Sequence, residues 1–474
     1  MIFASFEFLF LFLPLFLAVY FVTPFAWRNW PILIFSWAFY AWWRVDFLAL
    51  LISVTVFTFV VARIMARVGP KTVWGRRLLV VGLVGNLGVL AVFKYANFSV
   101  QALNDLLGGI GHAPVAWAEI VLPIGLSFYV LQSVSYLIDV WRGDIPVSRS
   151  FLNYAAYKAV FAQLIAGPIV RYAEVAEELK HRAHSWAQFG LGARRFAMGF
   201  AAKVCIADTL SPAVDAVYAL PQPSLVDAWA GALAYTLQLY FDFAGYSSMA
   251  LGLALMLGFH FPENFRDPYL SGSIQEFWQR WHMTLSRFLR DYLYIPLGGS
   301  RKGQRRTYVN LFLTMLLGGF WHGANWTFLA WGAWQGGLLT LHRAWRRAGH
   351  GPMPWLPAHL LTLLVVLLGW VAFRAPDFAS AVRMYGAMLG GPGLGLSDAL
   401  AWQITPDQWW CGVIAILLVY APLLERRLAP GPDPAPPGHP LVRAATAVGP
   451  LLAFVLGLVL LYSRAAVPFL YFQF

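Results

Sequence analysis

Polar and ionisable side chains gather in one part of this sequence, residues 239–336, between long apolar runs. Two histidines stand out there: His322 within Gly-Gly-Phe-Trp-His-Gly, and His282 within Arg-Trp-His. An imidazole with an ordinary pKa of about 6.5 is the side chain best suited to general-base chemistry near neutral pH. Polar groups are costly in lipid, so such a block inside apolar sequence marks a functional site by default.

The spacing of basic residues places His322 at a turn. Only 36 residues separate Arg306 from Arg343, whereas two full membrane crossings need about 40 residues at about 20 each. We therefore predict that 307–321 and 326–341 form a helical hairpin that only just reaches the far side of a membrane, or falls short of it. His322 would then lie near the transition from the inner to the outer side.

The predicted apex of this hairpin reads Trp321-His322-Gly323-Ala324-Asn325. Its small residues are expected to leave room for a ligand, which makes Trp321 and Asn325 candidates for substrate contact. The alternative interpretation is a core histidine that is hydrogen-bonded to a neighbouring helix.

The stretch 277–289 is predicted to be helical. Trp278, His282 and Ser286 would then share one face, because residues four apart lie above one another on a helix. Arg280 lies on another face, where it can pair with a glutamate four residues earlier. Trp278 and Arg280 are therefore further candidates for substrate binding. The alternative is a solvated amphipathic helix with an incidental histidine.

Asp242 stands inside an apolar run, where it could pair with an arginine, orient a histidine or bind a ligand, and a structural pair is favoured. The other eight histidines are predicted to lie in loops or at the surface: His112, His181, His184, His260, His342, His350, His359 and His439. The chain has no His-x-x-x-His or Cys-x-x-Cys spacing, so we expect no metal site. Without a Walker A or G-x-G-x-x-G fingerprint, an ATPase or a Rossmann enzyme is not expected either.

The amino-acid composition indicates that this protein lies in a lipid membrane. Of the 474 residues, 59% are hydrophobic and 12% are charged, about half the charged share of a soluble domain. This excludes a soluble enzyme, a disordered chain and a disulfide scaffold. The formal net charge of +12 comes from basic residues between the apolar runs, which is the positive-inside pattern of a membrane protein. No nucleic-acid partner is expected.

The predicted fold is an all-α polytopic membrane protein with about 11–13 transmembrane or re-entrant helices around a central funnel or pocket, plus interfacial helices. Several apolar runs are too short to cross alone, and irregular backbone at membrane depth occurs only around cavities. The expected spans are 8–22 (retained, with the N-terminus outside), 31–43, 46–62, 78–96, 119–141, 154–170, 225–243, 246–260, 307–321, 326–341, 358–373, 409–424 and 443–462.

Two further stretches, 171–204 and 274–291, are predicted to be amphipathic and to lie along the interface or line a funnel. We expect one membrane-embedded domain over 1–474, with its catalytic block at 239–336. A proline-rich loop is expected at 428–440.

These motifs together resemble the membrane-bound O-acyltransferase superfamily, in particular its bacterial branch typified by the membrane component of alginate O-acetylation. The resemblance runs along nearly the whole chain, and the 239–336 block matches best. Outside that block it rests on the runs 8–14, 40–48, 93–98, 122–129 and 164–168.

The resemblance implies an integral, multi-pass enzyme of the bacterial inner membrane. Such an enzyme would take an acetyl group from a cytoplasmic donor, acetyl-CoA or an acyl carrier, and pass it across the membrane. The acetyl group would O-acetylate an alginate-like or cellulose-like exopolysaccharide. No tightly bound cofactor is expected, and a periplasmic or membrane-anchored acetyltransferase is the expected partner.

The family's active-site histidine falls on His322 and its second characteristic histidine on His282. His322 is expected to act as general base or to carry the acetyl group as an acyl-imidazole. His282 and Asn325 would stabilise the oxyanion or hold the donor. The alternatives are D-alanyl or other acyl transfer to a cell-wall polymer, and a non-catalytic acetyl-group permease or scaffold.

Overall fold

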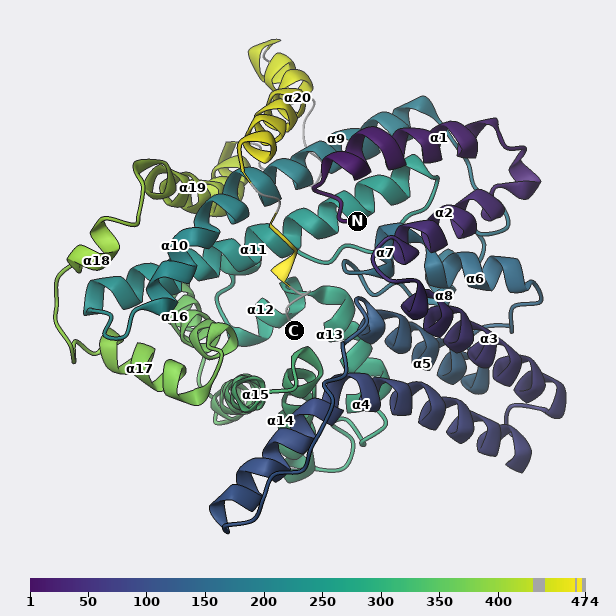
Figure 1. Cartoon of the computed structure of the whole chain (residues 1–474), viewed down its shortest axis with the longest axis horizontal. Coiled ribbons are helices and arrows are strands. Elements are labelled where there is room, and N and C mark those ends of the chain that lie inside the picture. The colour runs from purple at the N-terminus through teal and green to yellow at the C-terminus, as the bar shows by residue number, and fades with distance from the viewer. Residues whose placement is uncertain (429–439, 465–466, 471–474) are drawn as a thin grey trace. The chain divides into compact units, whose positions relative to one another are not determined.

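The computed structural model describes residues 1–428, 440–464 and 467–470, without the side chains of 425–447. All regular structure in these ranges is helical, which confirms the all-α prediction (Figure 1). The predicted proline-rich loop at 428–440 falls almost entirely outside the described residues. The chain divides into two compact units, which are described separately: 1–190 with 253–262, and 191–252 with 263–473.

The first unit packs its helices around an aromatic core. The Phe161 ring stands edge-on to Phe12 and Phe16, with ring centroids 5.2 and 4.9 Å apart, an arrangement that aromatic pairs prefer. The helices that begin in this unit are α1 (Leu13–Val22), α2 (Asn29–Ala41), α3 (Val45–Val68), α4 (Val73–Gly109), α5 (Leu126–Arg142), α6 (Phe151–Ala159), α7 (Phe161–Leu164), α8 (Tyr172–Val175) and α9 (Trp186–Ala201). A π-helical segment, Glu7–Phe12, precedes α1, and a 3₁₀ turn, Phe25–Trp27, precedes α2.

The predicted span 154–170 is a buried, broken segment. It holds the end of α6 and the four-residue α7, and Gly167 has a φ of +112°. This agrees with the expectation of interrupted helices. The predicted span 119–141 becomes helical only at Leu126, because Gly125 turns with a φ of +77° against the Leu164 carbonyl oxygen.

The second unit contains the candidate site. α9 continues into it and leads through a π-helical segment, Ala202–Ala207, to α10 (Asp208–Ala219). The remaining helices are α11 (Leu225–Met256), α12 (Ile274–Arg280), α13 (Met283–Leu289), α14 (Gln304–His322), α15 (Trp326–Arg347), α16 (Trp355–Arg374), α17 (Phe378–Met388), α18 (Asp398–Ala401), α19 (Pro406–Leu428) and α20 (Pro440–Ser463). A 3₁₀ turn, Pro268–Leu270, precedes α12, and a π-helical segment, Arg290–Tyr294, follows α13.

The predicted spans 225–243 and 246–260 are one helix, α11, at least to Met256. The glycine between them does not break it. A Cβ on Gly245 would lie 2.7 Å from the Gly199 carbonyl oxygen, so this glycine lets α9 and α11 approach backbone to backbone. Small residues are used in this way where helices cross in membranes.

Five helical stretches of the described residues are long and apolar enough to cross a membrane: Val45–Val68, Val73–Gly109, Trp186–Ala219, Trp355–Arg374 and Pro406–Leu424. The third includes the second part of the stretch 171–204, from Trp186 onward. Whether that part crosses the membrane, lies along the interface or lines a funnel stays a prediction. The predicted total of 11–13 helices in the membrane stays a prediction.

Candidate active site around two buried histidines

α14 and α15 form the predicted hairpin, with Gly323–Asn325 between them (Figure 1). Two glycines allow the two helices of the hairpin to approach each other closely. A Cβ on Gly319 would lie 2.4 Å from the Phe328 carbonyl oxygen, and one on Gly332 would lie 2.7 Å from that of Met315. The close approach fixes His322, the last residue of α14, relative to the first turns of α15.

His322 is 5% exposed and lies within an aromatic enclosure. Its ring stands steeply inclined to those of Trp321, Trp331 and Phe373, with centroid distances of 5.0, 5.2 and 5.4 Å. The expectation that small residues leave room here is wrong at Gly323. A Cβ there would lie 2.1 Å from the Phe328 ring, so this glycine serves packing.

His282 breaks the helix that was predicted over 277–289. It has a φ of +40° and lies between the end of α12 and the start of α13. The predicted shared face of Trp278, His282 and Ser286 is therefore wrong. The physical cause is tertiary: the Arg280 carbonyl accepts from the Arg266 amide, and the Met283 amide donates to Asn264.

His282 is fully buried, which excludes the solvated amphipathic helix. Its Nδ1 lies 3.0 Å from Asn264 Oδ1, which also accepts from Thr284 Oγ1 at 2.9 Å, while Asn264 Nδ2 donates to Ser247. Because a carbonyl oxygen only accepts, Nδ1 carries the proton and Nε2 is left as the basic atom. Burial lowers the pKa of His282, so the ring is neutral.

Trp321 connects the two histidines. Its ring centroid lies 6.5 Å from that of His282 and 5.0 Å from that of His322. Residues that are 40 positions apart in the sequence therefore contact the same indole. The structure brings together the two histidines and the tryptophan that the sequence singled out.

Polar groups on α15 extend the site beyond the predicted residues. The Trp278 indole N–H donates to Gln335 Oε1 at 3.2 Å. Gln335 Nε2 and Trp331 Nε1 are buried and make no hydrogen bond within the described part of the chain. Each such group costs about 1–3 kcal/mol unless a ligand or water satisfies it. Trp331 and Gln335 are four residues apart, so the sequence itself places them one helical turn from each other on α15.

Asp242 is held in a buried ion cluster. Its Oδ1 forms an ion pair with Lys203 Nζ at 2.9 Å, and its Oδ2 accepts a hydrogen bond from the Leu470 backbone amide at 2.9 Å. Lys203 also pairs with Asp208. The geometry therefore favours the structural pair over a ligand contact at this position.

Arg280 and Asn325 also have partners within the protein. Arg280 pairs with Glu276 at 2.6 Å, as predicted. Asn325 caps α15 by accepting from the Thr327 amide, and its Nδ2 donates to the Pro376 carbonyl at 2.7 Å. A substrate contact by Asn325 would have to displace one of these bonds.

His359 was predicted in a loop or at the surface, and this is wrong. It is 1% exposed, lies parallel to Trp355, and its Nε2 is 2.8 Å from the Tyr420 hydroxyl. No group of three potential metal ligands gathers among the residues whose positions are described.

Both histidines lie inside residues 119–362, which match the sequence profile of the membrane-bound O-acyltransferase family. The chain belongs to this family. It is thus a membrane-embedded O-acyltransferase. The probable alginate O-acetylases AlgI of Azotobacter vinelandii and Pseudomonas putida are each 46% identical to it over 100% of both chains. The peptidoglycan O-acetyltransferase of Helicobacter pylori is 37% identical over 82% of this chain and 80% of its own length.

Proposed function

We propose that this acyltransferase moves an acetyl group from a cytoplasmic thioester to the other side of the bacterial inner membrane, for O-acetylation of an alginate-like or cellulose-like exopolysaccharide. The names of its full-length relatives support the polymer class. The observation that carries the mechanism is the buried imidazole of His322 at the tip of the α14–α15 hairpin.

His322 acts as the general base in this proposal. As the acceptor hydroxyl attacks the thioester carbonyl carbon, the imidazole takes the hydroxyl proton, a C–O bond forms and the C–S bond breaks. The imidazolium then returns the proton to the departing thiolate, which leaves an ester and a free thiol. No oxidant or metal is required. The water-poor aromatic surroundings strengthen each electrostatic interaction in the site.

Trp331 and Gln335 take the role of oxyanion donors. The sequence-based hypothesis gave this role to His282 and Asn325, but Nε2 of His282 is an acceptor and the amide of Asn325 is engaged at both ends. The buried N–H groups of Trp331 and Gln335 have no partner within the described residues, and Trp331 contacts His322. Donors placed in advance stabilise a developing oxyanion most effectively.

His282 then serves as a second acceptor beside the reacting groups. Its Nε2 lone pair can accept from a second O–H or N–H of the bound substrates and so position them. Its ring, like that of His322, lies beside Trp321.

The donor reaches the site from the basic ends of the hairpin. The far ends of both arms carry exposed basic residues: Arg301 and Lys302 just before α14, Arg305 and Arg306 in its first turn, and Arg343, Arg346 and Arg347 at the end of α15. By the positive-inside rule both ends are cytoplasmic. Their charge would attract the phosphates of acetyl-CoA or of an acyl carrier. A periplasmic or membrane-anchored acetyltransferase would complete the transfer to the polysaccharide.

The test is acetyl transfer by the purified protein in lipid with labelled acetyl-CoA. His322→Ala should abolish donor consumption while the protein stays folded in the membrane. Gln335→Leu should lower the rate about tenfold or more, since one oxyanion donor contributes about 2.7–4 kcal/mol in a well-studied case. The control is His350→Ala, an exposed histidine just beyond α15. Wild-type turnover in His322→Ala would overturn the assignment.

Accessibility gives a second, independent test. Cysteine at position 324, in a chain whose Cys205 and Cys411 are replaced by alanine, should react poorly with an impermeant thiol reagent from outside. Full labelling from outside would place the site at the surface and contradict a transfer through the membrane.

A further inference from the structure

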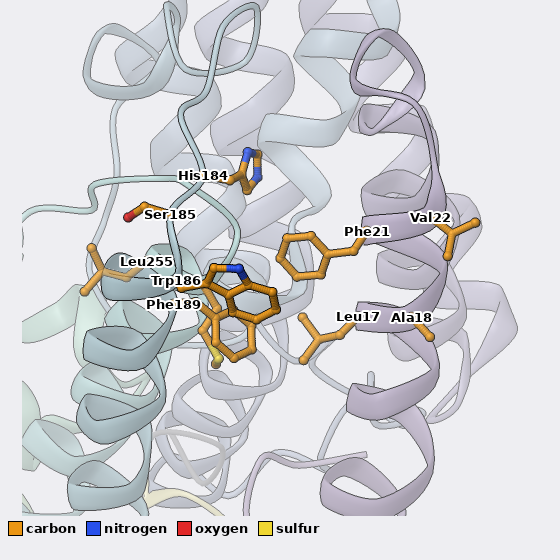
Figure 2. Close-up of a pocket in the computed structure, with 10 residues that line it drawn as sticks. Leu17, Ala18, Phe21, Val22, His184, Ser185, Trp186, Phe189 and Leu255 are labelled. Atoms are coloured by element: carbon orange, nitrogen blue, oxygen red, sulfur yellow. The ribbon is translucent and has the colours of Figure 1, made fainter. Parts of the chain in front are cut away.

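An apolar groove of about 550 Å³ lies in the first unit, and none of the candidate site residues lines it. In Figure 2, Leu17 and Phe21 of α1 project toward Trp186 and Phe189 of α9, and the His184 imidazole lies at one end. Leu255, near the end of α11, lines the groove as well. Every apolar surface of a membrane protein meets lipid, so the groove alone identifies no ligand.

Arg28 and Arg182 lie near the end of the groove that contains His184. They distinguish this groove from a purely apolar lipid-facing surface. Arg28 Nη1 lies 3.2 Å from His184 Nδ1, and its guanidinium is 5.6 Å from the centre of the Phe21 ring. Arg182 is 8% exposed and donates to the Tyr20 hydroxyl and to Asn29. Their guanidinium groups are therefore fixed in place beside the groove.

Neither arginine forms an ion pair within the described part of the chain. Glu178, the nearby carboxylate, is bonded to the ring and the backbone amide of His260. The pKa of His184 is lowered, first by burial and then by Arg28 and Arg182. Its neutral ring can accept from Arg28 but cannot compensate charge. Glu178 compensates part of the charge of Arg182. The rest of the desolvation cost of these two cations, one almost fully buried, is one that a bound anion would offset.

We propose that this groove binds a phospholipid, with an acyl chain along Leu17, Phe21 and Trp186 and the phosphate at Arg28. An apolar groove with His184 at one end, and the Arg28 guanidinium in contact with that histidine, matches a molecule with a chain and an anionic head. Arg28 donates to the carbonyls of Thr23 and Phe21 and to His184, and this leaves part of its five N–H donors for phosphate oxygens. The proposal is independent of the acetyl-transfer chemistry.

The experiment uses the full-length protein in detergent after lipid removal. Binding of phosphatidylglycerol is measured by native mass spectrometry, beside diacylglycerol, which lacks the phosphate, and glycerol phosphate, which lacks the chains. We expect phosphatidylglycerol alone to bind tightly. Equal binding of diacylglycerol, or of glycerol phosphate alone, would overturn the proposal.

Two variants test the charged end and the apolar part of the proposed lipid site separately. Arg28→Gln should weaken phosphatidylglycerol binding at least about tenfold, because hydrogen bonds to charged groups are stronger than neutral ones. Arg44→Gln is the matched control, since Arg44 also lies over a phenylalanine but is paired with Asp46. Ala18→Trp, which fills the groove from α1, should weaken binding without touching the charge. Wild-type affinity in Arg28→Gln or in Ala18→Trp would refute the site.

Discussion

Asn264 sets the tautomer of His282, and its replacement gives the sharpest test of the candidate site. Its Oδ1 accepts from His282 Nδ1 at 3.0 Å, from Thr284 Oγ1 at 2.9 Å and from the Thr284 amide at 3.3 Å. Asn264→Ala removes all three acceptor contacts in a buried place. At about 0.5–1.5 kcal/mol each, the loss amounts to roughly 2–4 kcal/mol of stability.

The catalytic effect follows from the bond to His282 alone. If this bond contributes about 1.4 kcal/mol, its loss lowers the ratio of the Nδ1–H tautomer to the Nε2–H tautomer about tenfold. We therefore expect Asn264→Ala to lower the acetyl-transfer rate several-fold, and at most about tenfold, in protein that is still folded. The assay is donor consumption in lipid, with the thermal midpoint in detergent as the measure of stability.

Two further variants make the test specific. Ser247→Ala removes the partner of Asn264 Nδ2 and leaves the acceptor oxygen in place, so its rate should stay within about threefold of wild type. Asn264→Asp keeps the acceptor and adds a negative charge, which raises the pKa of the neighbouring imidazole. His282 Nε2 accepts a hydrogen bond only while the ring is neutral, so the acidic limb of the rate profile should move to higher pH. An unchanged rate in Asn264→Ala, or equal losses in Asn264→Ala and Ser247→Ala, would refute this reasoning.

Two other predictions concern packing. Gly332→Ala should lower stability by about 1–3 kcal/mol, because its Cβ would lie 2.7 Å from the Met315 carbonyl oxygen; Gly337→Ala on the same helix meets nothing within 4 Å and should leave the thermal midpoint equal or higher. Equal losses in the two glycine variants would contradict this account of the hairpin. His359→Phe should cost about 1–3 kcal/mol by leaving the Tyr420 hydroxyl without its partner. Combining it with Tyr420→Phe should add little, and full additivity of the two losses in thermal unfolding would show that they do not interact.

The sequence alone determined that the protein lies in lipid and that 307–341 forms a helical hairpin. Composition requires lipid because the chain carries more apolar surface than one soluble core can bury. The hairpin followed from two basic clusters too close together for two complete crossings, a constraint set by bilayer thickness and helix rise. One argument depends on the overall composition and the other on the number of residues between two basic clusters. Neither depends on a particular contact, so both hold whatever the helices pack against.

The local geometry of the site was decided by tertiary contacts. The pattern over 277–289 fits a helix. However, the segment around Asn264 forms hydrogen bonds with backbone groups on both sides of His282, and the chain turns there. No periodicity within 277–289 could reveal a partner that lies about 20 residues away.

Tertiary contacts also decided the roles of Asp242 and Gly245. Asp242 could have bound a ligand or a cation until folding placed Lys203 and the Leu470 amide against it. Gly245 looked like a gap between two spans until Gly199 was found facing it. Sequence shows which residues could do chemistry or approach closely, but the partner in each case comes from a distant segment, and only packing in three dimensions selects it.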